Sequence, residues 1–135
     1  MNADVEKLYA LTDLVILDIK HIDSAEHVKL VGFPNKNPLA MAAYREKTGK
    51  PMWLRYVLVP GYNDSEEVVR RWCEAFAAYR TVERVELLPY HTLGVSKYAE
   101  LGRRYPLEGV EPPSSASIAQ ARKILEEFFD QVSVH

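Results

Sequence analysis

The first residues with the potential for ligand chemistry are Asp18 and Lys20, which follow a strand-like apolar segment. Side chains alternate across a strand, so this carboxylate and this ammonium group point to the same side. In α/β folds, ligand sites lie at the carboxyl ends of the strands. The pair therefore fits two interpretations: a solvated ion pair that ends a strand, or one wall of a ligand site.

Two later segments also carry polar groups at or near a strand end. Arg55 lies within the apolar segment 52–59 and shares a face with apolar neighbours. A buried guanidinium requires an anionic or strongly polar partner, so a structural salt bridge is the alternative to a ligand. His91 follows the segment 82–89, where a structural or solvated role is the alternative. If the three strands are neighbours, these groups together suit a zwitterionic ligand that carries a heterocycle.

The order of strand and helix patterns predicts an α/β fold, because it alternates as the β-α units of a parallel sheet do. The run 13–19 is almost wholly apolar, which predicts burial on both faces. Asn37 before Pro38 predicts the start of a helix. Residues 90–117 form a connection of a length that is often functional. We expect strands at 13–19, 52–59, 82–89 and 132–134, and helices near 5–9, 38–48, 65–79 and 118–128.

The composition is that of an ordinary globular domain of 135 residues. Its 17 basic and 19 acidic residues give a net charge of −2, which favours neither nucleic acid nor an anionic membrane as a partner. No apolar run reaches the roughly 20 residues that a membrane span needs. The only cysteine, Cys73, lies on the apolar face of a helix and is predicted to be buried. With no signal-peptide pattern, we expect a reducing, cytoplasmic location.

Five stretches that span most of the chain carry a family resemblance: LDIKHID (17–23), KLVGFPN (29–35), WLRYVLVPGYND (53–64), VERVELLPYHTLGVSKY (82–98) and LEGVEPPS (107–114). In this order they resemble the activating enzymes of glycyl radical enzymes, which are radical S-adenosylmethionine (SAM) proteins. The closest likeness is to the activating enzyme of pyruvate formate-lyase. The combination of RYVLVPG with VELLPYHTLG is specific to this family.

The resemblance implies that residues 1–135 are a single fragment, the carboxyl-terminal half of a partial (β/α)6 TIM-like barrel with about three β-α units. SAM would lie at the carboxyl ends of the parallel strands. The matching residues would contact different parts of SAM. They are Asp18, Ile19 and Lys20 at the methionyl end, Arg55 in the pocket wall and His91 beside the adenine.

The chain departs from the family at the metal chemistry. The family binds a 4Fe–4S cluster in a Cys-x3-Cys-x2-Cys loop, and this sequence has no such loop and one cysteine. The one metal site that the resemblance implies here is for a monovalent cation, held by Asp18 and the backbone carbonyl of Ile16. We therefore predict no catalytic residue in this chain and no reaction from the chain alone.

Two functions remain as hypotheses. In the first, the chain is part of an activase in which SAM yields a 5′-deoxyadenosyl radical that takes hydrogen from a glycine of a pyruvate formate-lyase-type partner. In the second, it is a non-catalytic module that pairs with a separate cluster-bearing half. Either leaves a strand edge exposed, so we expect a homo-oligomer. Arg55, without its ligand, is expected to find a substitute anion or a carboxylate such as Asp18.

Overall fold

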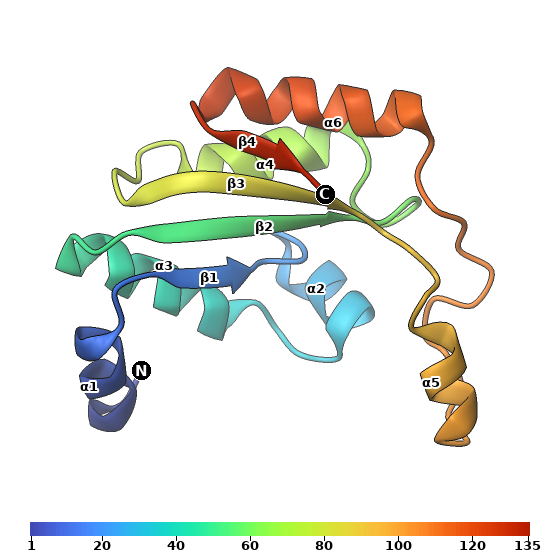
Figure 1. Ribbon diagram of the computed structural model, residues 1–135, viewed down its shortest axis with the longest axis horizontal. Coiled ribbons are helices and arrows are strands. Elements are labelled where there is room, and N and C mark those ends of the chain that lie inside the picture. The colour runs from blue at the N-terminus through green and yellow to red at the C-terminus, as the bar shows by residue number, and fades with distance from the viewer.

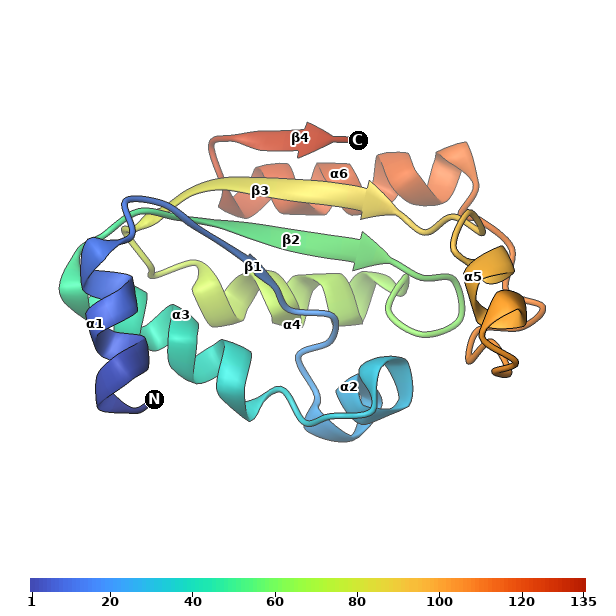
Figure 2. The same cartoon turned by 60° about the horizontal axis from the view of Figure 1, so that its bottom comes forward.

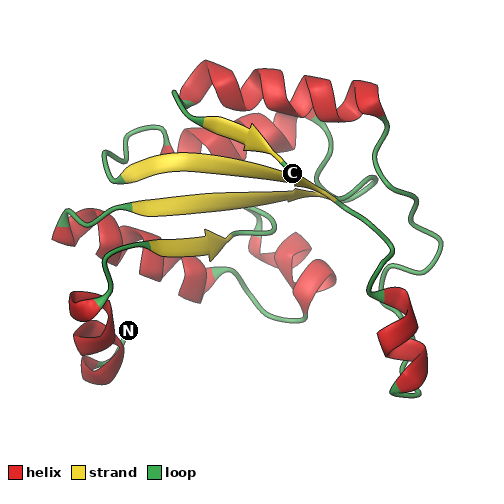
Figure 3. Ribbon diagram, in the orientation of Figure 1, coloured by secondary structure: helices red, strands yellow, loops and turns green.

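The computed structural model describes residues 1–135 as one parallel four-stranded sheet with helices (Figures 1 and 3). The strands are hydrogen-bonded in the order β1-β2-β3-β4, and every pair is parallel. This confirms the predicted α/β fold. The elements are α1 (Ala3–Leu11), β1 (Val15–Asp18), α2 (Ser24–Val31), α3 (Lys36–Thr48), β2 (Met52–Leu58), α4 (Glu66–Phe76), β3 (Val82–Pro89), α5 (Val95–Glu100), α6 (Ser115–Phe128) and β4 (Val132–Val134).

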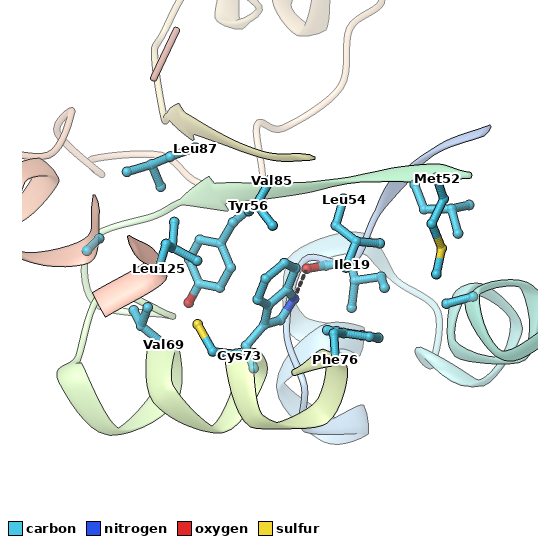
Figure 4. Close-up of a cluster of buried hydrophobic side chains, with 14 of the residues drawn as sticks. Ile19, Met52, Leu54, Tyr56, Val69, Cys73, Phe76, Val85, Leu87 and Leu125 are labelled. Carbon is cyan, nitrogen blue, oxygen red and sulfur yellow. Dashed lines mark hydrogen bonds between the residues drawn. The ribbon is translucent and has the colours of Figure 1, made fainter. Parts of the chain in front are cut away.

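Helices α3, α4 and α6 cover one face of the sheet, and the core lies between them and the strands (Figure 2). Alternate residues of β2 are fully buried, so one side of this strand belongs to the core and the other does not. Figure 4 shows the centre of this core, where strand side chains meet those of α4 and α6. The labelled residues are Ile19, Met52, Leu54, Tyr56, Val69, Cys73, Phe76, Val85, Leu87 and Leu125.

The prediction that β1 is buried on both faces was wrong. Its burial alternates, and the side chain of Ile16 points to the uncovered face, where the residue is 43% exposed. The reason is that β1 is an edge strand and no helix covers this face of the sheet. The uncovered face therefore carries the side chains at alternate positions of every strand, including Asp18 and Arg55.

The helix expected at 38–48 begins earlier, at Lys36. Asn35 precedes it and uses its side-chain amide to donate to the carbonyls of His21 and Ile22, at 3.2 and 2.6 Å. Pro38 still fits, because N–H groups in the first turn have no acceptor within the helix. The helix ends at Gly49, which has a positive φ of 69°.

Two short helices were not predicted from the sequence. Helix α2 follows β1, and α5 lies within the long connection 90–117, beyond the carboxyl ends of the strands (Figure 1). Both are short, and neither shows a long amphipathic period. No helix of the protein is long and apolar enough to cross a membrane.

A buried arginine ties the amino-terminal side of the sheet together. Arg45 of α3 is 1% exposed, and its guanidinium donates to three carbonyls. Its Nε and Nη1 atoms reach the oxygens of Pro51 and Tyr9, both at 3.1 Å, and its Nη2 reaches that of Asp13 at 2.5 Å. These carbonyls belong to the end of α1 and to the residues before β1 and β2. One side chain therefore fixes how three segments enter the fold.

Candidate functional site

A row of charged residues crosses the uncovered face near the carboxyl ends of the strands. The sheet register places Asp18 opposite Arg55, Arg55 opposite Glu86, and Glu86 opposite Ser133. The row therefore alternates carboxylate, guanidinium and carboxylate across three neighbouring strands. This confirms that the strands carrying Asp18 and Arg55 are adjacent, on which the ligand-site interpretation depends.

Asp18 and Lys20 form the ion pair that their spacing predicts. The Nζ atom of Lys20 lies 2.9 Å from Oδ1 of Asp18, and the two side chains are 28% and 45% exposed. Such an accessible pair contributes little to stability, about 1 kcal/mol or less. Both groups therefore remain accessible to a ligand on the uncovered face.

Arg55 pairs with a carboxylate, as expected, but the partner is Glu86 and not Asp18, which was the example given. Its Nε donates to Oε2 of Glu86 at 2.6 Å, while Lys20 already bonds the Asp18 carboxylate. The hydrogen bond to Glu86 raises the pKa of the Arg55 guanidinium against the opposing effect of burial, and the charges of Glu86 and Asp18 raise it further. The two Nη groups make no hydrogen bond within the protein, and the side chain is 37% exposed.

Glu86 is the acidic residue that the sequence reading missed. Its side chain is 7% exposed, and its second oxygen, Oε1, lies 3.5 Å from Nε2 of His135. His135 continues the line of β4, because its N–H donates to the carbonyl of Leu87 at 3.1 Å. The stretch VELLPYH contained the signal, since an acidic residue between apolar strand residues needs a cation when it is buried.

His91 borders a cavity of about 530 Å³ at the end of the charged row. Val57 and Leu88, from the uncovered face of β2 and β3, form its sheet side, and Tyr98 and Tyr105 line it from the long connection. The two tyrosine rings meet edge to face, 5.1 Å apart. His135 also lines this cavity. An aromatic, partly apolar space therefore adjoins a row of charges.

The Tyr105 hydroxyl is tied to its neighbour in the same segment. It shares a hydrogen bond of 2.8 Å with the hydroxyl of Tyr90. Burial raises the pKa of Tyr105 to about 12, and the Tyr90 hydrogen bond adds to this effect. The Tyr105 hydroxyl stays neutral at physiological pH, and its hydrogen bond to Tyr90 holds the long connection against the strand end.

Asn63 fixes the carboxyl ends of β1 and β2 relative to each other. Its Nδ2 donates to the carbonyls of Lys20 and Val57, at 2.9 and 2.8 Å, and its Oδ1 accepts from the N–H of Val59 at 2.7 Å. The residue is 1% exposed. In sequence it reads as an ordinary turn residue after Pro-Gly, so its role in positioning Lys20 was not predicted.

The two remaining predicted residues, Ile19 and Ile16, lie on opposite faces of the sheet. The Ile19 side chain lies in the core, its N–H donates to Arg55 and its carbonyl accepts from Nε1 of Trp72 at 3.0 Å. Ile16 lies on the uncovered face beside Asp18. Nowhere in the protein do three or more His, Cys, Asp or Glu side chains gather in a way that could hold a metal ion.

The cysteine does not fit an iron–sulfur cluster. Cys73 is fully buried in the core, and burial raises the pKa of its thiol to about 12. Cluster binding needs several accessible thiolates, and this chain has one inaccessible thiol. The prediction that Cys73 is a buried apolar residue is confirmed.

Comparison with known proteins finds relatives that align with most of the chain. It is 48% identical over 120 residues to the pyruvate formate-lyase-activating enzyme of Streptococcus mutans, 43% identical to that of Staphylococcus epidermidis, and 41% identical to that of Listeria monocytogenes. These matches cover 89–90% of the chain. Over about nine tenths of its length the chain is similar to pyruvate formate-lyase-activating enzymes. It spans about half the length of the curated relatives it matches, 46–49%. No family model matches it.

Solved structures share the fold of this chain. A domain of the pyruvate-formate lyase-activating enzyme from Bacteroides vulgatus aligns with the whole chain at a TM-score of 0.81 and 22% identity, and 74% of that domain is covered. A radical SAM methyltransferase from Sphaerobacter thermophilus aligns with 89% of the chain at a TM-score of 0.67 and 19% identity, over 33% of its own length. These similarities confirm the α/β fold with four parallel strands, which aligns with structural neighbours of TIM-barrel type.

Proposed function

We propose that this chain is the carboxyl-terminal half of a glycyl-radical-enzyme activase and supplies the SAM-binding wall of its barrel. The observation that carries the proposal is the charged row beside an aromatic cavity on the uncovered face. Lys20 and Arg55 offer cations, and Asp18 offers a carboxylate, at one end. The cavity bordered by His91 lies at the other. SAM has the complementary order: an amino-acid group, a sulfonium and a flat heterocycle.

The residues of the row have separate roles in this proposal. Lys20 and the free Nη groups of Arg55 bind the SAM carboxylate, and Asp18 accepts from its ammonium group. The adenine lies against His91 and Tyr98. When bound beside a reduced cluster, SAM supplies the 5′-deoxyadenosyl radical chemistry by which such an enzyme oxidises a glycine of its partner. A monovalent cation at Asp18 and the Ile16 carbonyl remains part of the proposal.

The cluster belongs to a segment outside these residues, because Cys73 does not fit it. The chain therefore contributes binding and orientation, and we predict no SAM cleavage without a cluster-bearing segment. The partner is a glycyl radical enzyme of the pyruvate formate-lyase type. A cytoplasmic location, where thiols stay reduced, accompanies this function.

Titration of the ¹⁵N-labelled chain with SAM, followed by NMR, tests the binding site. We expect shifts at Lys20, Arg55, Val57 and His91. The Arg55→Lys variant keeps a cation beside Glu86 but loses the planar pair of Nη groups, so its affinity should fall about tenfold or more.

Arg84 provides the matched control for this titration. It is another arginine on the uncovered face, nearer the amino ends of the strands, with its guanidinium 4.4 Å from the Trp53 ring centre. Arg84→Lys should leave SAM affinity unchanged. Shifts confined to residues around Arg84, or no shifts at millimolar SAM, would refute the proposed site.

The second candidate function is an association module, favoured by the open edge of the sheet. Both β1 and β4 are edge strands, and α1 and α2 lie on the β1 side of the molecule (Figure 1). Seven of the eleven exposed large apolar residues fall within residues 1–33: Met1, Leu8, Leu11, Ile16, Val28, Val31 and Phe33. An open strand edge flanked by exposed apolar side chains favours association with another chain. We propose that the occupant in the isolated protein is a second copy.

Sedimentation equilibrium at high micromolar concentration tests this association. We expect a dimer for the native chain and a shift toward monomer for Ile16→Lys, because a lysine on an edge strand opposes pairing. Leu101→Lys, at an exposed position far from β1, should remain dimeric. A monomeric native chain contradicts the second-copy proposal, and formation of a complex only with a cluster-bearing half identifies that half as the occupant.

A further inference from the structure

Glu86 is much less accessible than the other carboxylate of the charged row. Its side chain is 7% exposed, whereas that of Asp18 is 45% exposed. A carboxylate so little hydrated needs a bonded cation, and Arg55 meets this need at 2.6 Å. The pairing is selective, because the register also places Asp18 opposite Arg55 on the other side. Arg55 lies between two carboxylates and bonds the one on β3.

The atom through which Glu86 holds Arg55 decides what the guanidinium can still do. Glu86 accepts from Nε, the nitrogen nearest the arginine stem. A guanidinium has five N–H groups, so the four on the two Nη atoms remain for another acceptor. The two Nη atoms lie in one plane, so an N–H group from each can bind a carboxylate or phosphate through two parallel hydrogen bonds.

The alternative partner would remove this capacity. If Arg55 turned to Asp18, it would compete with Lys20 for the same carboxylate, whose Oδ1 Lys20 bonds at 2.9 Å. Both cations of the row would then be neutralised by one anion. Glu86 prevents this by drawing the guanidinium toward β3, where His135 lies 3.5 Å from the other carboxylate oxygen.

We infer that Glu86 is a positioning residue that holds Arg55 away from Asp18 and keeps its Nη groups available to the anionic end of the ligand. The inference rests on the proposed function for the identity of the ligand, SAM. The geometry of Arg55 itself does not depend on that ligand. Two measurements therefore test the position of Arg55 and the binding of SAM separately.

The first readout is the Arg55 Nε–H resonance in the ¹⁵N spectrum without ligand. We expect an exchange-protected signal in the native chain, its loss in Glu86→Ala, and partial retention in Glu86→Gln, whose amide oxygen can still accept from Nε. Glu83→Gln removes an equal charge from an exposed position on the same strand and should leave the signal unchanged. An unaltered Arg55 signal in Glu86→Ala overturns the inference.

The second readout is SAM affinity across the same variants. Glu86→Asp keeps the charge but shortens the side chain by one methylene, so positioning predicts a loss on the order of tenfold, which pure charge balance does not. A merely structural Glu86 would lower the melting temperature while the folded fraction binds SAM as the native chain does, and this result overturns the inference. If the native chain binds no SAM, the proposed function fails, and the Nε–H signal alone then decides the role of Glu86.

Discussion

Replacement of Arg45 by methionine should lower the free energy of unfolding by about 3 kcal/mol or more. Methionine fills most of the space of the side chain but leaves the carbonyls of Asp13 and Pro51 without a donor, and it leaves that of Tyr9 with the Thr12 N–H alone. Each orphaned acceptor costs about 1–3 kcal/mol. Urea denaturation followed by circular dichroism measures the loss.

Arg122 offers a matched control for this experiment. It is an exposed arginine of α6 whose Nε donates to Glu126 at 2.7 Å, a surface pair within one helix. Arg122→Met should cost well under about 1 kcal/mol. An Arg45→Met variant no less stable than Arg122→Met would show that water replaces the three hydrogen bonds at little cost.

Replacement of Asn63 by leucine should both destabilise the protein and weaken the ligand site. The two side chains have similar volumes, but leucine leaves the N–H of Val59 and the carbonyls of Lys20 and Val57 unpaired. We expect a loss of about 2–4 kcal/mol in unfolding free energy. Hydrogen exchange at the Val59 amide should become much faster, because its acceptor is gone.

The same substitution at an exposed asparagine separates a general effect from this local one. Asn37→Leu in α3 should leave stability and Val59 exchange near their native values. Slow Val59 exchange in Asn63→Leu would contradict the role given to Asn63. Because Asn63 bonds the carbonyl of Lys20, SAM affinity should also fall in Asn63→Leu and stay unchanged in Asn37→Leu.

Much of the fold follows from local pattern. The apolar runs gave the strands to within two residues at each end, and the helix end expected at 48 and the helix start expected at 65 lie within one residue of those observed. Period and capping are properties of neighbouring residues, so they can be read from one sequence. The side to which Asp18 and Lys20 point followed from alternation alone.

The partner of Arg55 could not be obtained in this way. Whether it faces Asp18 or Glu86 depends on how β1 and β3 are shifted against β2, and the helices between the strands set that register. Asn63 was missed for a related reason, because its three side-chain hydrogen bonds join segments that are up to 43 positions apart. Asn-Asp after Pro-Gly looks the same in a plain turn.

The division of each strand between a covered and an uncovered face has a consequence for insertions and deletions. Loss of one residue within β2 before position 55 would turn Arg55 into the core and bring Tyr56 to the ligand face. The core and the ligand site would both be disrupted, because their residues alternate along one strand. A deletion of the same size within 101–113, in the loop between α5 and α6, would leave every strand in phase. Length changes among natural variants of this chain should therefore be found in that loop and be absent from the strands.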